Sequence, residues 1–260
     1  MRGTELIKRM EILAPPNFAE DWDNVGLLAG RSSKEIRKVY LALDATDEVI
    51  EDAIEAEADM LITHHPLIFK GLKRVTSEDF IGRRILRILQ SDLCYYAMHT
   101  NFDVMGMADA AADELNLQNR QVLAVTFEDE LSKEGIGRYG RLPGRMTLME
   151  CAAYVKKTFK LPAVRVYGEA EEEVEIAAIS PGSAKTAVPY ALQTGVDVLI
   201  SGDIDHHMGI DLVAQGINVI DAGHYGLEKL FVPYMREYFA RNLPELSVEA
   251  AEDKSPYLVV

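Results

Sequence analysis

Short apolar runs alternate with amphipathic stretches along most of the chain. Lys38–Asp44 (KVYLALD), Met60–Thr63 (MLIT) and Leu93–Met98 have the length and the content of buried strands. The intervening stretches, Asp47–Ala58 and Ser77–Gln90, place apolar residues on one face of a helix. This alternation predicts right-handed βαβ crossovers and a mostly parallel sheet.

The second half of the chain continues the alternation. It predicts helices at Ala108–Leu117, Leu148–Phe159, from about Ala184, and at His206–Ala214, and strands at Val164–Tyr167, Val174–Ser180, Val198–Ser201 and Ile217–Asp221. Gly226–Arg241 is expected to be helical, with a kink or restart at Pro233. Gly135–Gly144 is too glycine-rich for a regular element, and Pro181–Lys185 reads as a tight turn, with an anion-binding nest as the alternative.

These elements favour an α/β fold with two lobes, each built around a mostly parallel sheet. The pattern changes near Gln118–Glu134, where a β-like run is followed by acidic residues. We therefore expect lobes at 1–125 and 126–260, with the C-terminal helix able to pack on the first lobe.

Composition narrows the classes of partner. The 260 residues are 48% hydrophobic and carry a net charge of -15, which disfavours free nucleic acid and membrane surfaces. A nucleotide remains possible, because a metal ion can supply positive charge. Cys94 and Cys151 hardly define a disulfide framework, and the N-terminus lacks the apolar core of a signal peptide. A cytoplasmic protein is expected.

All six histidines lie at or soon after the end of a predicted strand, in the segments MLIT-HHP, YYAM-HTNFD, VLIS-GDIDHH and INVID-AGHYGLE. Ligands of open α/β sheets gather at the carboxyl ends of the strands. A single histidine at such a position is usually a hydrogen-bonded loop residue, and His99 with Asp103 could be a capping and turn pair. The concurrence of several donors favours a metal site.

The segment GHYGLE carries the sharpest signal. If a helix begins by Tyr225, His224 and Glu228 project from one face, one turn apart, and could chelate a metal. Gly223 and Gly226 would let the backbone approach the site. A surface i,i+4 pair at a helix start is the alternative.

Five donors, too many for a four-coordinate catalytic zinc, suit two metals that share a bridging carboxylate. The predicted ligands are His64, His65, Asp103, His224 and Glu228. Nitrogen and oxygen donors leave zinc, iron and manganese open. The other candidates are His99, His206 and His207 for orientation of ligands or proton transfer, and Trp22, Asp23 and Asn24 as a turn or a substrate-binding rim.

The motifs WDNVGL, ITHHPLIF, HTNFD, GDIDHH and DAGHYGLE, in this order, resemble the NGG-one-interacting-factor-three-like family. Its members are also labelled GTP cyclohydrolase I type 2 homologues or dinuclear-metal-centre hexameric proteins. The resemblance implies a homohexamer of two-lobed α/β subunits, with two divalent metal ions per subunit on the five ligands named above and the site in the crevice between the lobes.

Two functions remain open. The family label implies a metal-dependent hydrolase acting on a nucleotide, GTP. In that case we expect Glu228 to be the bridging ligand. The alternative is a non-catalytic metal-binding scaffold or regulatory hexamer that interacts with other proteins, because no base- or ribose-recognition motif stands out.

Overall fold

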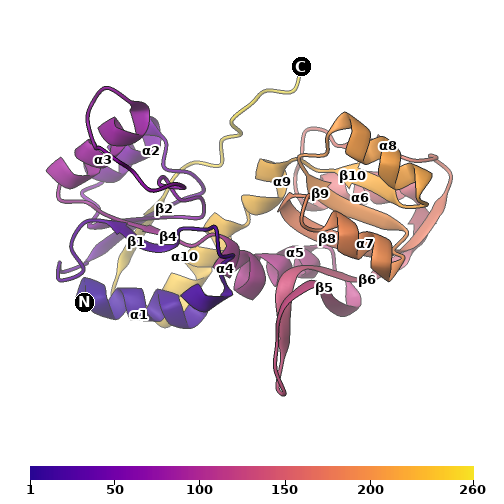
Figure 1. The fold of residues 1–260 in the computed structure, drawn as a ribbon, viewed down its shortest axis with the longest axis horizontal. Helices are drawn as coiled ribbons and strands as arrows, with labels where there is room; N and C mark the ends of the chain where they lie inside the picture. The colour runs from indigo at the N-terminus through magenta and orange to yellow at the C-terminus, as the bar shows by residue number, and fades with distance from the viewer. The chain divides into compact units, whose positions relative to one another are not determined.

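The structure, a computed structural model, describes residues 1–260 and contains two compact units (Figure 1). Unit 1 comprises Met1–Phe102 and Phe231–Asp253, and unit 2 comprises Asp103–Leu230 and Lys254–Val260. Each unit has its own β-sheet covered by helices, so the predicted α/β class is confirmed. None of the helices combines the length and apolar content that a bilayer span requires.

The chain leaves unit 1 after Phe102, upstream of the expected lobe boundary at 1–125 and 126–260. The reason is packing that the hydrophobic pattern does not encode. Ala111 and Ala112 of α5 (Ala108–Glu114) enter the core of unit 2. The C-terminal helix α10 (Phe231–Asn242) packs on β2 and β11 of unit 1, which makes both units discontinuous in sequence.

Unit 1 has a five-stranded sheet in the order β1-β4-β3-β2-β11. The strands are β1 (Gly26–Ala29), β2 (Lys38–Ala42), β3 (Met60–Thr63), β4 (Cys94–Ala97) and β11 (Ser247–Ala250). All are parallel except β1, which pairs antiparallel with β4. The helices of this unit, besides α10, are α1 (Gly3–Leu13), η1 (Pro16–Phe18), α2 (Asp47–Glu55), α3 (Phe80–Gln90) and α4 (Thr100–Phe102).

The strand register explains how this sheet is buried on both faces. Tyr40, Leu61 and Tyr95 lie side by side and pack, in one core cluster, with apolar residues of α2 and α3. Their neighbours in sequence point to the opposite face, because side chains alternate along a strand. Figure 1 shows α2 and α3 on one side of the sheet and α1 and α10 on the other.

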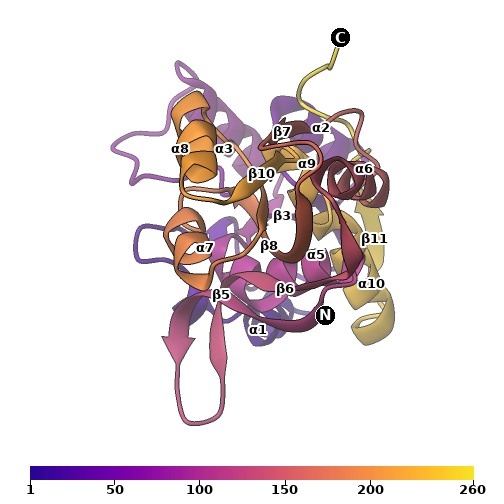
Figure 2. The ribbon, with the colours of Figure 1, turned by 90° about the vertical axis from the view of Figure 1, so that its right-hand side faces the viewer.

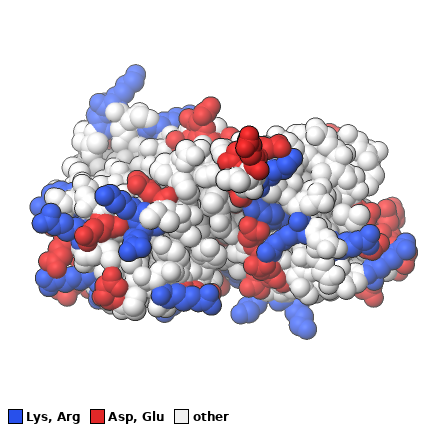
Figure 3. All heavy atoms as spheres, turned by 90° about the horizontal axis from the view of Figure 1, so that it is seen from below, with Lys and Arg blue, Asp and Glu red and all other residues white.

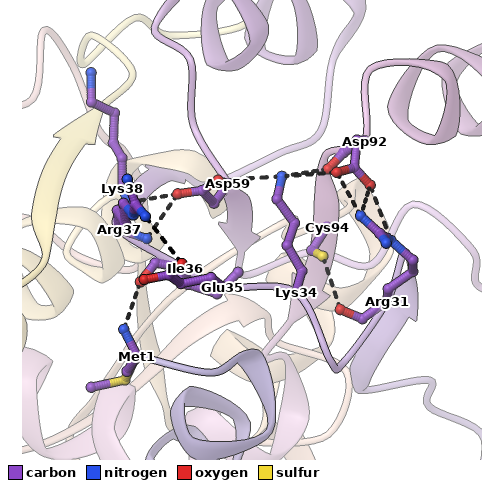
Figure 4. Close-up of polar contacts among 10 residues, drawn as sticks. All are labelled: Met1, Arg31, Lys34, Glu35, Ile36, Arg37, Lys38, Asp59, Asp92 and Cys94. Atoms are coloured by element: carbon purple, nitrogen blue, oxygen red, sulfur yellow. Dashed lines mark hydrogen bonds and ion pairs between the residues drawn. The ribbon is translucent and has the colours of Figure 1, made fainter.

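The connection from β1 to β2 is fastened by charged side chains (Figure 4). The Met1 amine donates to the Ile36 carbonyl at 3.0 Å. Asp59 Oδ2 accepts from the backbone N–H groups of Arg37 at 2.8 Å and Lys38 at 3.1 Å, and Asp59 Oδ1 lies 3.3 Å from Lys34 Nζ. The carboxylate thereby aligns the start of β2 with the start of β3.

Unit 2 has a six-stranded sheet in the order β5-β6-β8-β9-β10-β7. The strands are β5 (Gln118–Glu128), β6 (Lys133–Thr147), β7 (Arg165–Tyr167), β8 (Glu173–Ser183), β9 (Val198–Gly202) and β10 (Asn218–Asp221). Only β8, β9 and β10 are parallel to one another; the other pairings are antiparallel, so the expectation of a mostly parallel sheet is wrong for this unit. The helical segments are η2 (Asp103–Met107, a π-helix), α5, α6 (Leu148–Thr158), α7 (Val188–Thr194), α8 (His206–Ala214) and α9 (His224–Glu228).

Helices cover both faces of this sheet as well. Ile179, Ile200 and Ile220 belong to the core cluster that includes α5 and α6. Ala178, Leu199 and Val219, their neighbours in sequence, belong to the cluster that includes α7 and α8. Figure 2 shows α7 and α8 on one side of the sheet and α6 on the other.

The expectation that Gly135–Gly144 forms no regular element is wrong, because this segment lies within β6. Its glycines allow close strand approach rather than a turn. A Cβ on Gly135 would lie 1.9 Å from the Ala124 carbonyl oxygen, and one on Gly140 would lie 2.6 Å from that of Gln118. Likewise, β8 extends through Ser183, so part of Pro181–Lys185 is strand.

The excess negative charge does not form a single block on the face drawn in Figure 3. There, acidic and basic side chains are interspersed among uncharged ones. This mixture is typical of an ordinary solvated surface.

We expect Asp59→Ala to lower the free energy of unfolding by about 1–3 kcal/mol, because two backbone donors and Lys34 lose their acceptor. Urea denaturation would measure the change. Asp52→Ala, an exposed change on α2, is the matched control and should not destabilise the protein beyond ~0.5 kcal/mol. Equal stability of the two variants would contradict the role given to Asp59.

Candidate metal centre

The ends of two neighbouring strands of unit 1 bring three histidines together. His64 and His65 follow β3, and His99 follows β4. One ring nitrogen of each lies within 4.8 Å of those of the other two. His64 is fully buried, whereas His65 and His99 are partly exposed.

Each of these imidazoles is held through Nδ1 by an oxygen acceptor. His64 Nδ1 lies 2.8 Å from the Met98 carbonyl oxygen, and His65 Nδ1 lies 2.8 Å from Asp44 Oδ1. His99 Nδ1 lies 2.8 Å from Asp23 Oδ1. A neutral imidazole that donates from Nδ1 carries its lone pair on Nε2, the arrangement that metal-ligating histidines show in proteins.

Asp23 is the most strongly fixed of these acceptors. Its carboxylate also accepts from the Thr100 backbone N–H at 3.0 Å and from Thr100 Oγ1 at 2.5 Å. Burial raises the pKa of Asp23, but the hydrogen bonds from His99 and Thr100 outweigh it and lower the pKa to about 2. Asp23 is therefore ionised at neutral pH and orients the ring of His99.

In unit 2, the first turn of α9 presents His224 and Glu228 together, as the spacing in GHYGLE predicts. His224 Nε2 lies 2.8 Å from Glu228 Oε2, and His224 Nδ1 lies 2.8 Å from Asp203 Oδ2. Glu228 is only 2% exposed. A neutral imidazole has one N–H, so it cannot donate to both carboxylates, and a cation or a second proton is needed to satisfy the arrangement.

Two glycines make room for this pair. Gly182, in β8, has φ +77°, and a Cβ there would lie 2.3 Å from Glu228 Oε1. A Cβ on Gly202, at the end of β9, would lie 2.4 Å from the His224 backbone nitrogen. The backbone of two strands thus packs directly against the side chain of Glu228 and the start of α9.

Asp103, another predicted ligand, is the first residue of η2. It belongs to unit 2 and is partly buried. His206 and His207, by contrast, are exposed at the start of α8, and neither belongs to a group of potential metal ligands.

Of the expected rim residues, Trp22 is 60% exposed and its ring centroid lies 5.8 Å from that of His99. Asn24 Nδ2 donates to the Ile68 carbonyl at 2.6 Å. Asp23 is not available to a substrate in this arrangement, because its oxygens are engaged by His99 and Thr100.

Asp44 and Asp203, which position His65 and His224, were not identified from the sequence. Asp44 ends one predicted strand and Asp203 comes two residues after another, and this place at a strand end was the signal that could have found them.

The donor chemistry fits divalent transition metals. The imidazole and carboxylate side chains suit zinc, iron or manganese. The acceptors that orient four of the imidazoles match the hydrogen bonds that support metal-ligating histidines. The groups could therefore hold metal ions.

Two mixed α/β units with His and Glu groups of this kind define the class of the protein. The chain belongs to the Duf34/NIF3 (NGG1p interacting factor 3) family, whose model matches residues 1–256. The resemblance carried by the five sequence motifs is thus confirmed.

Curated relatives carry a common name. A "GTP cyclohydrolase 1 type 2 homolog" of Clostridium acetobutylicum is 35% identical over 230 residues, which cover 88% of this chain and 85% of that protein. A protein of the same name from Clostridium perfringens is 34% identical, over 88% of this chain and 87% of its own length.

Solved structures share the fold. A Bacillus cereus protein related to NIF3 matches with a TM-score of 0.90 over 100% of this chain and 99% of that chain, at 24% identity. A hypothetical protein of Staphylococcus aureus has a TM-score of 0.85 at 30% identity, with the same coverage. Reduced HcgD from Methanocaldococcus jannaschii has a TM-score of 0.82 at 30% identity, over 96% and 97% of the two chains.

We expect Asp203→Asn to weaken metal binding about 10- to 100-fold, because His224 loses the carboxylate that orients it. Asp203 has φ 54°, a conformation that asparagine tolerates, so the backbone should be unchanged. Competition with a chromogenic chelator would measure the affinity. Asp205→Asn, two residues away at the N-cap of α8, is the control; equal effects of the two changes would contradict this role of Asp203.

Gly182→Ala should displace the Glu228 carboxylate and weaken metal binding on the order of 10-fold or more. Gly195→Ala is the matched control, since Gly195 also has positive φ, +64°, but a Cβ there would have no neighbouring atom within 4 Å. Both variants should lose about 1 kcal/mol or more of stability through backbone strain. Thermal melting and metal affinity, measured on both, separate strain from displacement; unchanged affinity in Gly182→Ala would refute the expectation.

Proposed function

We propose that this protein binds two divalent metal ions per chain and acts as a metal-dependent hydrolase on a nucleotide. The proposed ligands are His64, His65, Asp103, His224 and Glu228, with Glu228 as the bridging carboxylate. Family membership and the name shared by the curated relatives support a GTP-like substrate.

One observation carries the proposal. Three imidazoles of unit 1, each anchored at Nδ1, lie with their ring nitrogens within 4.8 Å of one another. Bringing three basic rings together costs conformational freedom and solvation, which a purely structural role does not recover. Oriented imidazoles at strand ends instead favour a metal centre, at which His64 and His65 would be ligands and His99 would lie beside them.

When bound, divalent ions supply Lewis-acid polarisation of a substrate oxygen and activation of water at neutral pH. Asp44 and Asp203 hold His65 and His224 in the orientation that presents Nε2. Glu228 offers two carboxylate oxygens from a buried position.

His99 is proposed for proton transfer rather than as a ligand, since five other donors complete the set. Its Nδ1 is held by the ionised carboxylate of Asp23, which stabilises the ring when it takes a proton at Nε2. The position of His99 beside His64 and His65 gives it access to the same reacting groups.

A second function is supported by the family description, which refers to an interacting factor. In this alternative, the same metal ions stabilise a non-catalytic scaffold or regulatory hexamer that binds other proteins. Turnover decides between the two functions.

Protein loaded with zinc, manganese or iron and then desalted should contain two divalent ions per chain. Glu228→Ala should remove more metal than Asp103→Ala if Glu228 is the bridge. Elemental analysis would measure both, and trace metal in the loaded wild-type protein would rule out the proposed centre. Light scattering on the same preparations checks the homohexamer that the family resemblance implies, so that loss of metal is not confused with loss of assembly.

His99→Ala should keep its metal and hydrolyse a nucleotide ~10²–10⁴-fold more slowly, the usual contribution of proton transfer. Metal content and turnover are measured on one preparation, with His206→Ala as the control for loss of an exposed histidine. Loss of metal in His99→Ala would show that His99 is a ligand. Full activity of this variant would show that His99 has only a structural role. If metal-loaded wild-type protein turns over no member of a nucleotide panel, the hydrolase proposal fails and the scaffold alternative stands.

A further inference from the structure

Two exposed aromatic rings border the histidine group of unit 1. The ring centroids of Trp22 and Phe69 lie 5.8 Å and 5.6 Å from that of His99, and both rings meet the imidazole edge-on. Trp22 is 60% exposed and Phe69 is 47% exposed. Side chains of this size normally bury most of their surface, so their exposure beside a candidate metal centre needs a reason other than core packing.

These rings come from two loops that are fastened to each other. Asn24 Nδ2 donates to the Ile68 carbonyl at 2.6 Å, which joins the residue after Asp23 to the residue before Phe69. Asp23 itself is bound to His99 and Thr100. The two aromatic side chains are therefore held at a set position relative to the imidazoles.

The loop that carries Phe69 is basic. Lys70, Lys73 and Arg74 follow it within five residues, are exposed, and pair with no acidic side chain. Such a concentration of positive charge is unusual in a chain with a net charge of -15. These residues lie in the loop between β3 and α3, directly after the strand that delivers His64 and His65.

Aromatic faces and free cations recognise different parts of one ligand. A planar heterocycle stacks on an exposed indole or phenyl ring, and a phosphate group binds to lysine and arginine side chains. A protein partner would use the same apolar residues but would not need rings arranged around a candidate ligand set. The combination favours a small anion with a planar ring.

We propose that Trp22 and Phe69 form a stacking subsite for the base of a nucleotide and that Lys70, Lys73 and Arg74 bind its phosphates. This inference rests on the proposed function, because it names how that site recognises its substrate. It assigns base recognition to side chains outside the ligand set and phosphate recognition to a single loop.

Trp22 is the only tryptophan of the chain, so its fluorescence reports on the subsite directly. The full-length protein is titrated with GTP, guanosine and inorganic triphosphate, with and without a metal chelator. GTP should quench Trp22 saturably, guanosine should quench it only at higher concentration, and triphosphate should compete with GTP without quenching. Free tryptophan amide corrects for light absorbed by the base. Absence of saturable quenching by GTP and guanosine in both conditions would overturn the proposal.

Variants then test each part of the subsite. Phe69→Ala should weaken GTP binding on the order of 10-fold, the effect of losing one stacking partner. Phe80→Ala is the control, since Phe80 is also exposed, at 56%, but does not border His99. Equal affinity of the Phe69 and Phe80 variants would overturn the stacking role.

For the loop, Lys70→Ala, Lys73→Ala and Arg74→Ala are combined. Together they should weaken GTP binding roughly 10-fold, leave guanosine binding unchanged and reduce the salt dependence. The control combines Lys156→Ala, Lys157→Ala and Lys160→Ala, which remove the same charge from exposed positions in and just after α6 of unit 2. Equal losses in both triple variants would show that the loop acts only through the net charge of the protein, and would refute its specific role.

The subsite and the proposed function can fail separately. Nucleotide binding that depends on Phe69 without any turnover would leave the subsite standing and remove the hydrolase activity. Nucleotide turnover that is unaffected in the Phe69 and loop variants would remove the subsite and leave the hydrolase activity standing.

Discussion

The candidate site depends on one kind of interaction, a hydrogen bond from an imidazole Nδ1 to an oxygen acceptor near the end of a neighbouring strand. In unit 1, Ala42, Thr63 and Ala97 are aligned across β2, β3 and β4. Two residues beyond these positions stand Asp44, His65 and His99. The parallel register therefore brings an acid and two imidazoles to one edge of the sheet, where Asp44 can orient His65.

In unit 2, the register of the parallel strands also brings site residues to one edge of the sheet, but these residues are one acid and two glycines. Ile179, Ile200 and Ile220 occupy equivalent positions in β8, β9 and β10. Three residues further along each chain segment stand Gly182, Asp203 and Gly223. The acid orients His224, and the two glycines supply the positive φ and the open space that the start of α9 and the carboxylate of Glu228 require. A side chain at either glycine position would compete with the donors for that space.

The sequence predicts those parts of the fold and site that depend on local pattern. β3 and α8 match their predicted bounds, the restart of the last helix falls next to Pro233, and the one-turn spacing places His224 beside Glu228. The glycine content of Gly135–Gly144 led to the wrong prediction that this part of β6 is irregular, because Gly135 permits close strand pairing there instead of a turn. The short edge strands β1 and β11 were missed since none of their residues is buried, so their hydrophobic pattern is weak.

What escaped prediction depends on register and on long-range packing. Nothing in the local sequence states that Asp23 pairs with His99, 76 residues away, or that α10 returns to the first sheet.

In unit 1, the carboxylates of Asp23 and Asp44 each face one imidazole, that of His99 and that of His65. In unit 2, the single imidazole of His224 faces both the exposed Asp203 and the buried Glu228. An ionised carboxylate is costly to bury unless it is paired, and Glu228 is the buried member of this pair. Unit 1 therefore supplies imidazole donors and unit 2 a buried carboxylate, and donors of both kinds suit divalent transition metals.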